Sequence, residues 1–547
     1  MKLFFEQPAL AILLLLLWRA ACEQIVFSDN RPAISIQVTG PSQADLNATV
    51  SRALNTCQVR ELLGDSRYRL LYSELLSPST ELYPDTKDEG NMFQATVYDY
   101  TRGRVIFPKG ILPDIFSSDV ALANIQPLPS LEELAEAARI AGIGPSVTEN
   151  ARPYMPPYEA RDFPDGTSHR LLHLAIGSAN LSRLAYVNMN NGSVQAILAQ
   201  GAVCQAPADS NQASVNINTP GTANFVISKN GNTLWAFEVT RPSSSAGTNG
   251  AGIELRNVKY KGKSVLYQAS VPILNVEYED KTPPVSCGPY YRDWQNSEYP
   301  LHCPPAKEFA PWLRLCKTPA ATIVDPPFTD GGDFTGVAVS IEGQEVVLKS
   351  QMTAGWYRYT SEWRFDVDGT LRPRWGFGGV LLGDNCICHV HHHHVYWRLD
   401  FDIVSAGNNL VREFNNPPIF PGTKYHDKVY EVKREKDPGC HRHWEISNTR
   451  WRGKYALIPG PNDGVADEFG VGDMWVLKYH PGEIDDGVRF TSAIDAKANI
   501  DKFKNGEVVK DQDVVIWYAA HFKHNQSHEQ GPEHGHIVGP EIRPLQW

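Results

Sequence analysis

The stretch HHHHVYWRLDFDI, residues 391–403, joins a run of histidines to a strand-like segment of apolar, aromatic and acidic residues. Successive side chains on a β-strand point to opposite faces, so His389, His391 and His393 would share one face. Imidazoles on one face can bind the same metal ion, and imidazole suits copper, zinc, iron or nickel. The pattern predicts a metal site. The alternative is a solvated, histidine-rich strand that binds metal only adventitiously.

An acidic group follows the histidines in the same stretch. Asp400 and Asp402 share one face by the same alternation. Together with Asp513 and backbone carbonyl groups, they could form a hard-cation site for calcium. The alternative, which the spacing alone favours, is a solvated and charged strand edge.

Strand-like segments of this kind fill the second part of the chain. From about residue 216 onward they recur between clusters of Gly, Asn, Asp and Pro, and helical periodicity is almost absent. Examples are SVLYQASVPILNVEYE, EWRFDVDGTLRPRWGF and DVVIWYAAHF. This composition predicts one large antiparallel β-sandwich over residues 216–547, so the fold class is mainly β.

Two small α+β domains are predicted before the sandwich, over residues 45–118 and 125–212. In the first, RYRLLYSELL and FQATVYDYTRGRVIF read as strands, with a bend at residues 101–103. In the second, Ser130 begins a helix, with a glutamate three residues later as in a capping box. A hairpin turn is predicted at residues 190–192.

The N-terminus and the charge indicate the compartment and exclude some partners. Lys2 precedes an apolar run at residues 9–18, and small residues at 20–21 offer a cleavage site, which predicts a signal peptide over residues 1–22 and secretion. No later segment is long and apolar enough to cross a membrane, so no stable membrane insertion is expected. The 51 Lys+Arg against 62 Asp+Glu give a net charge of −11, and no basic run suggests a nucleic-acid partner.

Cysteines and glycosylation sequons fit a secreted glycoprotein. The chain has nine cysteines, and the even number after residue 22 permits disulfides without fixing their pairing. Asn-x-Ser/Thr sequons begin at Asn47, Asn180, Asn191 and Asn525.

The histidine stretch, followed by DVVIWYAAHFKH at residues 513–524, resembles the copper amine oxidases. In that family an H-x-H pair precedes an acidic R-L-D strand, and a third histidine follows the aspartate of a D-[IL]-V-x-W segment by eleven residues. The resemblance implies that His391, His393 and His524 bind copper. Other histidines also remain candidate ligands: His389, His521, His528, His534 and His536.

The same resemblance extends over most of the chain beyond the N-terminal segment. The sequence beginning NFVISKNGNTLWAFEV is similar to the opening of the family's catalytic domain, which is a dimeric β-sandwich, so a homodimer is implied. More faintly, residues 66–115 and 125–200 resemble the family's two small leading domains. The sequon at Asn525 directly follows His524, and a glycan there would collide with a buried metal site, so this sequon is expected to be unoccupied.

The family converts one tyrosine of an N-Y-[DE]-Y motif into topaquinone, in a self-modification that needs copper and oxygen. Here AGWYRYTSEWRFDVDGT, residues 354–370, is similar, and Tyr357 matches the precursor tyrosine. The flanks depart from the motif, because Trp356 replaces asparagine and Arg358 replaces an acid. An indole in place of a small amide could crowd the quinone.

Further roles are implied by EYEDKTPPVSCGPYYRDWQNSEY, residues 277–299, which resembles the family's substrate-binding region. Tyr278 would hydrogen-bond the quinone oxygen, and Tyr291 would line the entrance. Asp293 would be the base that removes the substrate α-proton, with an ordinary surface carboxylate as the alternative interpretation. A disulfide between Cys303 and Cys316 is also implied.

The resemblance implies a secreted primary-amine oxidase that uses copper and topaquinone derived from Tyr357. Its substrates would be a small-molecule primary amine and O2, and its products an aldehyde, ammonia and hydrogen peroxide. The alternative function is a catalytically impaired protein with the oxidase fold, acting as a secreted copper-binding or interaction protein. The altered flanks of Tyr357 favour this alternative, whereas the retained tyrosine and three histidines oppose it.

Overall fold

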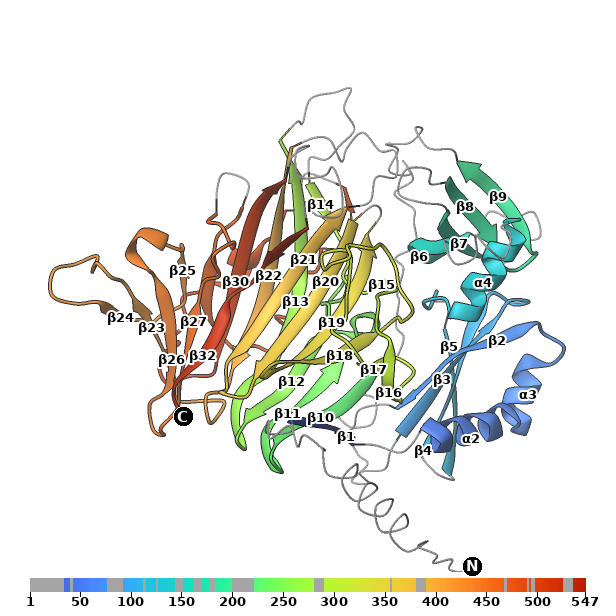
Figure 1. Cartoon of the computed structure of the whole chain (residues 1–547), viewed down its shortest axis with the longest axis horizontal. Helices are drawn as coiled ribbons and strands as arrows, with labels where there is room; N and C mark the ends of the chain where they lie inside the picture. The colour runs from blue at the N-terminus through green and yellow to red at the C-terminus, as the bar shows by residue number, and fades with distance from the viewer. Residues whose placement is uncertain are drawn as a thin grey trace, which may run out of the picture.

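The computed structural model describes residues 34–39, 43–75, 92–111, 115–123, 126–142, 151–160, 169–176, 183–198, 221–279, 290–354, 357–379, 390–466, 470–488, 491–492, 497–524 and 535–547. Figure 1 shows the strands of the two large sheets layered over one another in one body, with the two small modules at its right. The signal peptide, two sequons and Trp356 lie outside the described residues.

The first large sheet contains eleven strands of the described chain. Their order is β1 (Ile34–Thr39), β10 (Thr222–Lys229), β11 (Asn232–Thr240), β12 (Glu254–Tyr260), β13 (Lys263–Tyr278), β22 (His391–Phe401), β30 (Val514–His524), β28 (Met474–Lys478) and β25 (Val432–Arg434). β14 (Tyr290–Arg292) pairs with β13, and β29 (Thr491–Ser492) pairs with β14.

The second large sheet contains thirteen described strands. Their order is β16 (Pro305–Ala310), β17 (Leu313–Cys316), β18 (Val337–Glu342), β19 (Glu345–Ala354), β20 (Tyr357–Asp366), β21 (Leu371–Gly379), β32 (Glu541–Gln546), β27 (Lys454–Ile458), β26 (His443–Asn448), β23 (Asn409–Phe414) and β24 (Tyr425–Asp427). β15 (Glu298–Tyr299) pairs with β19, and β31 (His536–Val538) pairs with β21. Among these pairs, β17 and β18 run parallel and the others antiparallel.

The two large sheets pack face to face around one hydrophobic core. Phe237 of the first sheet stacks on Phe365 of the second, with ring centroids 4.2 Å apart. At the other end, Phe522 of the first sheet lies edge-on to Phe377 of the second at 4.5 Å. The predicted antiparallel β-sandwich is therefore confirmed, because aromatic and β-branched side chains from both sheets interdigitate.

Strand β22 occupies a central position, between β13 and β30, and all of its residues are buried. One face points into the core between the large sheets. The other face is covered by a second apolar cluster that includes Tyr396, Trp475 and Ile500. The interpretation of this stretch as a solvated histidine-rich strand was therefore wrong.

Two four-stranded sheets form the small modules. The first contains β2 (Tyr68–Leu75), β3 (Met92–Asp99), β4 (Arg104–Ile111) and β5 (Ile115–Ala123), with α2 (Gln43–Leu54) and α3 (Cys57–Leu63). The second contains β6 (Ala151–Ala160), β7 (His169–Ile176), β8 (Arg183–Asn188) and β9 (Ser193–Leu198), preceded by α4 (Leu131–Ile140). β5 extends past residue 118, where the first domain was predicted to end.

The two modules share a core and a buried ion pair. Side chains of both sheets and of α4 belong to one apolar cluster. Ser130 caps α4 as predicted, since its side chain accepts a hydrogen bond from the Glu133 backbone N–H. The Glu133 carboxylate then binds Arg170 of β7 at 2.8 Å and accepts a hydrogen bond from Tyr100 at 2.5 Å. These contacts join the first module to the second.

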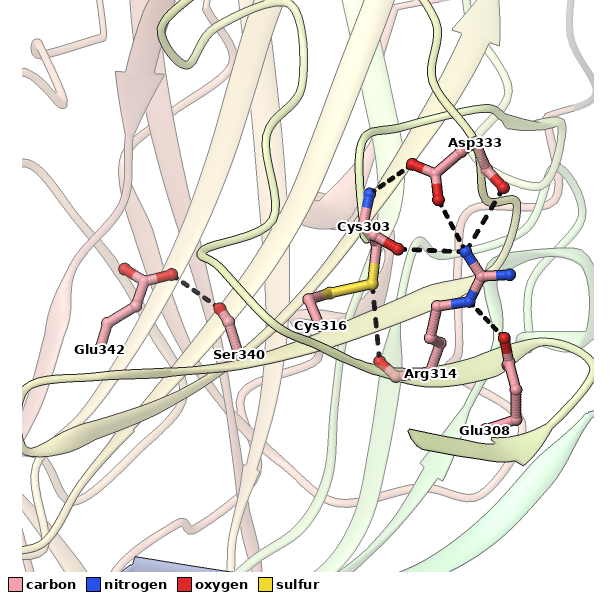
Figure 2. The surroundings of a disulfide bond; sticks show 7 residues. All are labelled: Cys303, Glu308, Arg314, Cys316, Asp333, Ser340 and Glu342. Carbon is pink, nitrogen blue, oxygen red and sulfur yellow. Dashed lines mark hydrogen bonds and ion pairs between the residues drawn. A yellow bond between two sulfur atoms is a disulfide. The ribbon is translucent and has the colours of Figure 1, made fainter. Parts of the chain in front are cut away.

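A disulfide joins Cys303 to Cys316 in the described chain, as the family resemblance implied. Figure 2 shows Arg314 beside it, donating to the Cys303 carbonyl at 3.1 Å and pairing with Asp333 at 2.9 Å. The disulfide and this ion pair fix both ends of the loop 317–336 between β17 and β18. Of the other described cysteines, Cys57 and Cys440 are free thiols. No described helix has the length and apolar character needed to cross a membrane.

Candidate active site

Three neighbouring strands of the first large sheet place aromatic and imidazole side chains in one row. In the register of the sheet, Tyr278 of β13 lies opposite His391 of β22, which lies opposite His524 of β30. His393, two residues along β22, shares this face. Ligand atoms of the three histidines all lie within 4.8 Å of one another, and the three side chains are buried. This is the geometry of a three-imidazole metal site.

Tyr357 reaches the histidines from the opposite sheet, at the first residue of β20. Its hydroxyl hydrogen-bonds the Nε2 atom of His391, and its ring lies edge-on to His393 with centroids 4.9 Å apart. Tyr278 also hydrogen-bonds Tyr357, and burial together with this neighbour raises the pKa of Tyr278 well above its usual range. Tyr278 is therefore held in the protonated form beside the histidines.

The surroundings of His393 show whether a metal ion fits this cluster. Its ring is fully buried, and neither of its nitrogens has a hydrogen-bond partner within the described structure. Burial lowers the pKa of His393 well below its usual range, so the imidazole is neutral and has a free lone pair. A buried polar group without a partner is costly, and a bound metal ion would supply one. The donor set therefore fits copper.

The opposite face of β22 carries the remaining histidines of this strand. His392 pairs with Glu279 at 2.9 Å, and His394 hydrogen-bonds His521 at 2.8 Å. His521 in turn contacts Asp473 at 3.1 Å, so it lies on the wrong face to be the third ligand of the cluster.

His536 lies near the cluster, with its ring centroid 5.6 Å from that of His524, but it is not among the three clustered ligands. His389, His528 and His534 lie outside the described residues, and so does Asn525.

Asp293 follows β14 and approaches the site from the side. Its side chain is 8% exposed, and the hydroxyl of Tyr359 donates to its Oδ2 atom at 2.5 Å. Burial raises the pKa of Asp293 to about 6, although the hydrogen bond from Tyr359 lowers it. The interpretation as an ordinary surface carboxylate was therefore wrong. A buried carboxylate that ionises near neutral pH is suited to proton transfer.

Two further tyrosines complete the surroundings. The rings of Tyr357 and Tyr359 stack at 5.7 Å, because residues two apart on β20 share a face. Tyr359 therefore links Tyr357 to Asp293, a contact that the sequence analysis missed although the Tyr-x-Tyr spacing indicated it. Tyr291 lies edge-on to Tyr278 at 5.7 Å, and its side chain is only half-buried.

Arg358 points away from the histidines, on the outer face of β20. It is fully buried and pairs with Asp330 at 2.8 Å. The arginine that replaces the expected acid therefore has its own partner and does not enter the cluster around Tyr357.

The acidic group forms a second cluster, farther along β22 and β30. Oxygen atoms of Asp400, Asp402 and Asp513 lie within 4.8 Å of one another, and each residue has one buried carboxylate oxygen without a hydrogen bond. Burial, with repulsion from the other two carboxylates, raises the pKa of Asp400 to about 8. Burial also raises the pKa of Asp402 to about 7 and that of Asp513 to about 6. Asp400 is 1% exposed, so the interpretation as a solvated strand edge was wrong.

Comparison with known proteins agrees with this geometry. Residues 332–546, which carry Tyr357 and all three clustered histidines, match the family model described as copper amine oxidase, enzyme domain. This match supports the copper amine oxidase family for the part of the chain that carries the site.

Similar proteins come from fungi, plants and bacteria. Copper amine oxidase 1 of Aspergillus niger is 24% identical over 345 residues, which is 51% of this chain and 51% of that protein. The primary amine oxidase of Klebsiella aerogenes is 23% identical over 269 residues, covering 38% of this chain and 34% of that protein. The chain thus matches about half or less of the length of these curated relatives.

Among solved structures, a copper-containing benzylamine oxidase from Hansenula polymorpha is 14% identical. The likeness covers 91% of this chain and 96% of that chain, with a TM-score of 0.49.

Proposed function

We propose that the chain is a secreted primary-amine oxidase that depends on copper and on topaquinone derived from Tyr357. The contact between the Tyr357 hydroxyl and His391, within a buried cluster of three histidines, is the observation that carries the proposal. When bound, copper supplies the oxidative chemistry that converts Tyr357, and topaquinone supplies the carbonyl and the electron sink for amine oxidation. The overall reaction converts amine, O2 and water into aldehyde, ammonia and hydrogen peroxide.

The side chains of this protein have separate tasks in that reaction. His391, His393 and His524 hold the metal. Tyr278 holds the oxygen atom of residue 357 through its hydrogen bond. Asp293 takes the proton from the substrate carbon next to nitrogen, since its carboxylate is ionised above about pH 6 and is shielded from water. Tyr359 orients that carboxylate.

Other parts of the proposal have their own support. The disulfide between Cys303 and Cys316 favours an oxidising compartment and hence secretion. The unpartnered oxygens of Asp400, Asp402 and Asp513 support a second site for calcium, which prefers carboxylate ligands. A homodimer is proposed from the family resemblance alone.

The release of hydrogen peroxide and aldehyde from simple primary amines tests the function. Copper-loaded protein should release both products, and Asp293→Asn should reduce kcat by about 10²–10⁴-fold while the protein retains copper. If Asp293→Asn released as much peroxide as wild-type protein, the peroxide would come from copper alone and not from amine oxidation with Asp293 as the base. No release by fully copper-loaded protein would favour the alternative, an oxidase fold that binds copper or a partner without turnover.

A further inference from the structure

We propose that Arg358 is a positioning residue of the candidate active site, which holds the backbone of Tyr357 and the segment carrying Asp293 in a fixed relation. The inference rests on the proposed function, because it concerns the alignment of the quinone precursor with the base. Arg358 is adjacent to Tyr357 in sequence but lies on the other face of β20, so it acts without touching the histidine cluster.

The guanidinium of Arg358 is fully buried and binds groups from several segments. Its Nη1 atom donates to the Tyr357 carbonyl at 3.2 Å and to the Thr353 hydroxyl of β19 at 2.8 Å. Its Nε atom donates to Asp330 of the loop 317–336 at 2.8 Å. The planar guanidinium group can make these contacts together because its donors have a fixed geometry.

Tyr299 connects Arg358 to the segment that carries Asp293. The guanidinium carbon lies 4.0 Å from the Tyr299 ring centroid, and the Tyr299 hydroxyl donates to Asp330 at 3.1 Å. Tyr299 belongs to β15, and Asp293 lies six residues earlier. The segment 293–299 is therefore attached to β20 at both ends, by Tyr359 at Asp293 and by Arg358 at Tyr299.

This arrangement predicts how the loss of Arg358 affects the site. Without the guanidinium, the segment 293–299 loses its attachment to β20 at Tyr299 and keeps its contact with Tyr359 and its pairing with β19. Asp293 would then be less well aligned with Tyr357. A displacement of about 1 Å can cost about 10²-fold in rate. The copper ligands belong to the other sheet, so metal binding should not change.

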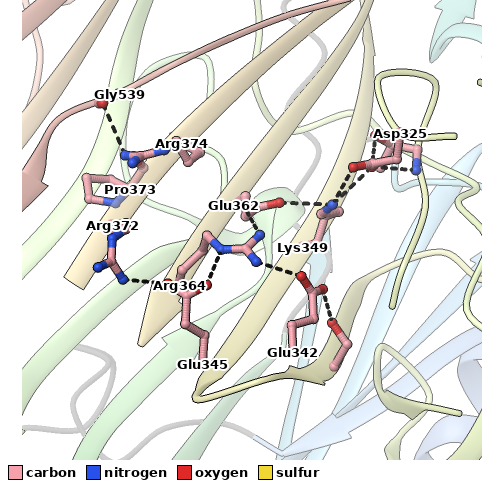
Figure 3. Close-up of polar contacts among 12 residues, drawn as sticks. Asp325, Glu342, Glu345, Lys349, Glu362, Arg364, Arg372, Pro373, Arg374 and Gly539 are labelled. Carbon is pink, nitrogen blue, oxygen red and sulfur yellow. Dashed lines mark hydrogen bonds and ion pairs between the residues drawn. The ribbon is translucent and has the colours of Figure 1, made fainter. Parts of the chain in front are cut away.

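The test compares Arg358→Gln and Asp330→Ala with Arg364→Gln. Arg364 lies on the same face of β20, six residues farther on, and has ion pairs with Glu342, Glu345 and Glu362 (Figure 3). The control therefore removes an arginine network from the same strand without touching the site. Asp330→Ala removes the partner of Arg358 from a position that is 25% exposed in its side chain, so it does not open a cavity in the core.

Two measurements are made on each protein. In metal-free protein, hydrogen–deuterium exchange should be faster in the segments 293–299 and 322–333 for both test variants and unchanged there for Arg364→Gln. In copper-loaded protein, kcat should fall by about 10²-fold in both test variants, with KM and bound copper nearly unchanged. This division between kcat and KM distinguishes alignment from a general loss of folded protein.

Several results would overturn the inference. Unchanged exchange in the segment 293–299, or equal loss of kcat in Arg364→Gln, would show that Arg358 does not position Asp293. If Arg358→Gln fails to fold, wild-type exchange and kcat in Asp330→Ala would be enough to reject it. If wild-type protein shows no amine turnover, the proposed function fails, but the exchange experiment still decides whether Arg358 holds this segment.

Discussion

Replacing Asp293 by asparagine should stabilise the metal-free protein, and the gain should grow with pH. Burial raises the pKa of Asp293 to about 6 from 3.8. Because the pKa of Asp293 is higher in the folded protein than in the unfolded protein, its contribution to the free energy of unfolding is greatest below about pH 4. This contribution is lost as the pH rises through 6. This change in pKa corresponds to about 3 kcal/mol of free energy that disfavours the ionised Asp293 carboxylate in the folded protein.

The asparagine side chain of this variant cannot ionise, and its oxygen can still accept the hydrogen bond from Tyr359. The difference in free energy of unfolding between Asp293→Asn and wild type should therefore increase by about 2–3 kcal/mol between pH 4 and pH 8. Other titrating groups are common to both proteins and cancel in the difference.

Urea denaturation at several pH values measures this difference, with fluorescence from the buried tryptophans of the sandwich as the signal. The comparison is valid where the m-values of the two proteins agree. A difference that stays constant from pH 4 to pH 8 would show that Asp293 has an ordinary pKa and is not suited to act as a base near neutral pH.

Three further predictions concern the neighbouring groups. Tyr359→Phe removes the hydrogen bond that lowers the pKa of Asp293, so the acidic limb of the pH profile of kcat/KM should move upward from about 6, and an unmoved limb would contradict this contact. His393→Gln should lose copper on dialysis while His394→Gln retains it, as metal analysis can show, because His394 lies on the opposite face of β22; equal retention would place the metal elsewhere. Removal of calcium with a chelator should lower Tm more at pH 8.5 than at pH 5.5, since the raised pKa values of the acidic cluster leave it largely protonated at low pH. Asp402→Asn should abolish most of this response, and an equal response in that variant would exclude the site.

The row of histidines could be predicted from the sequence because it depends on local geometry. The alternation of side chains on a strand places His391 and His393 on one face whatever the surrounding fold is. The assignment of His524 as a ligand was implied by the spacing in the family motif. The register of β22 and β30 explains this assignment, since His524 lies directly opposite His391. The same register places His521 opposite His394, on the other face.

The burial of the carboxylates could not be predicted from spacing. Asp293 is buried because β14 pairs with β13, and Asp400 is buried because β22 is covered on both faces. These contacts join segments far apart in the chain, and no local pattern in the sequence specifies them.

The role of Arg358 could not be predicted from the sequence either. Its partner Asp330 lies in a loop between two other strands, and no local pattern connects the two residues. Strand β1 was also missed, since it is a short segment that pairs with β10 almost 200 residues later.

The proposed function depends above all on whether Tyr357 forms a quinone when copper is present. Metal-free protein is loaded with copper in aerated buffer and titrated with phenylhydrazine, while the visible spectrum is recorded. Wild-type protein should form a new chromophore that Tyr357→Phe lacks, although both proteins bind copper. Wild-type protein that binds one copper per chain and forms no chromophore would show that Tyr357 is not converted and that the proposed function is wrong.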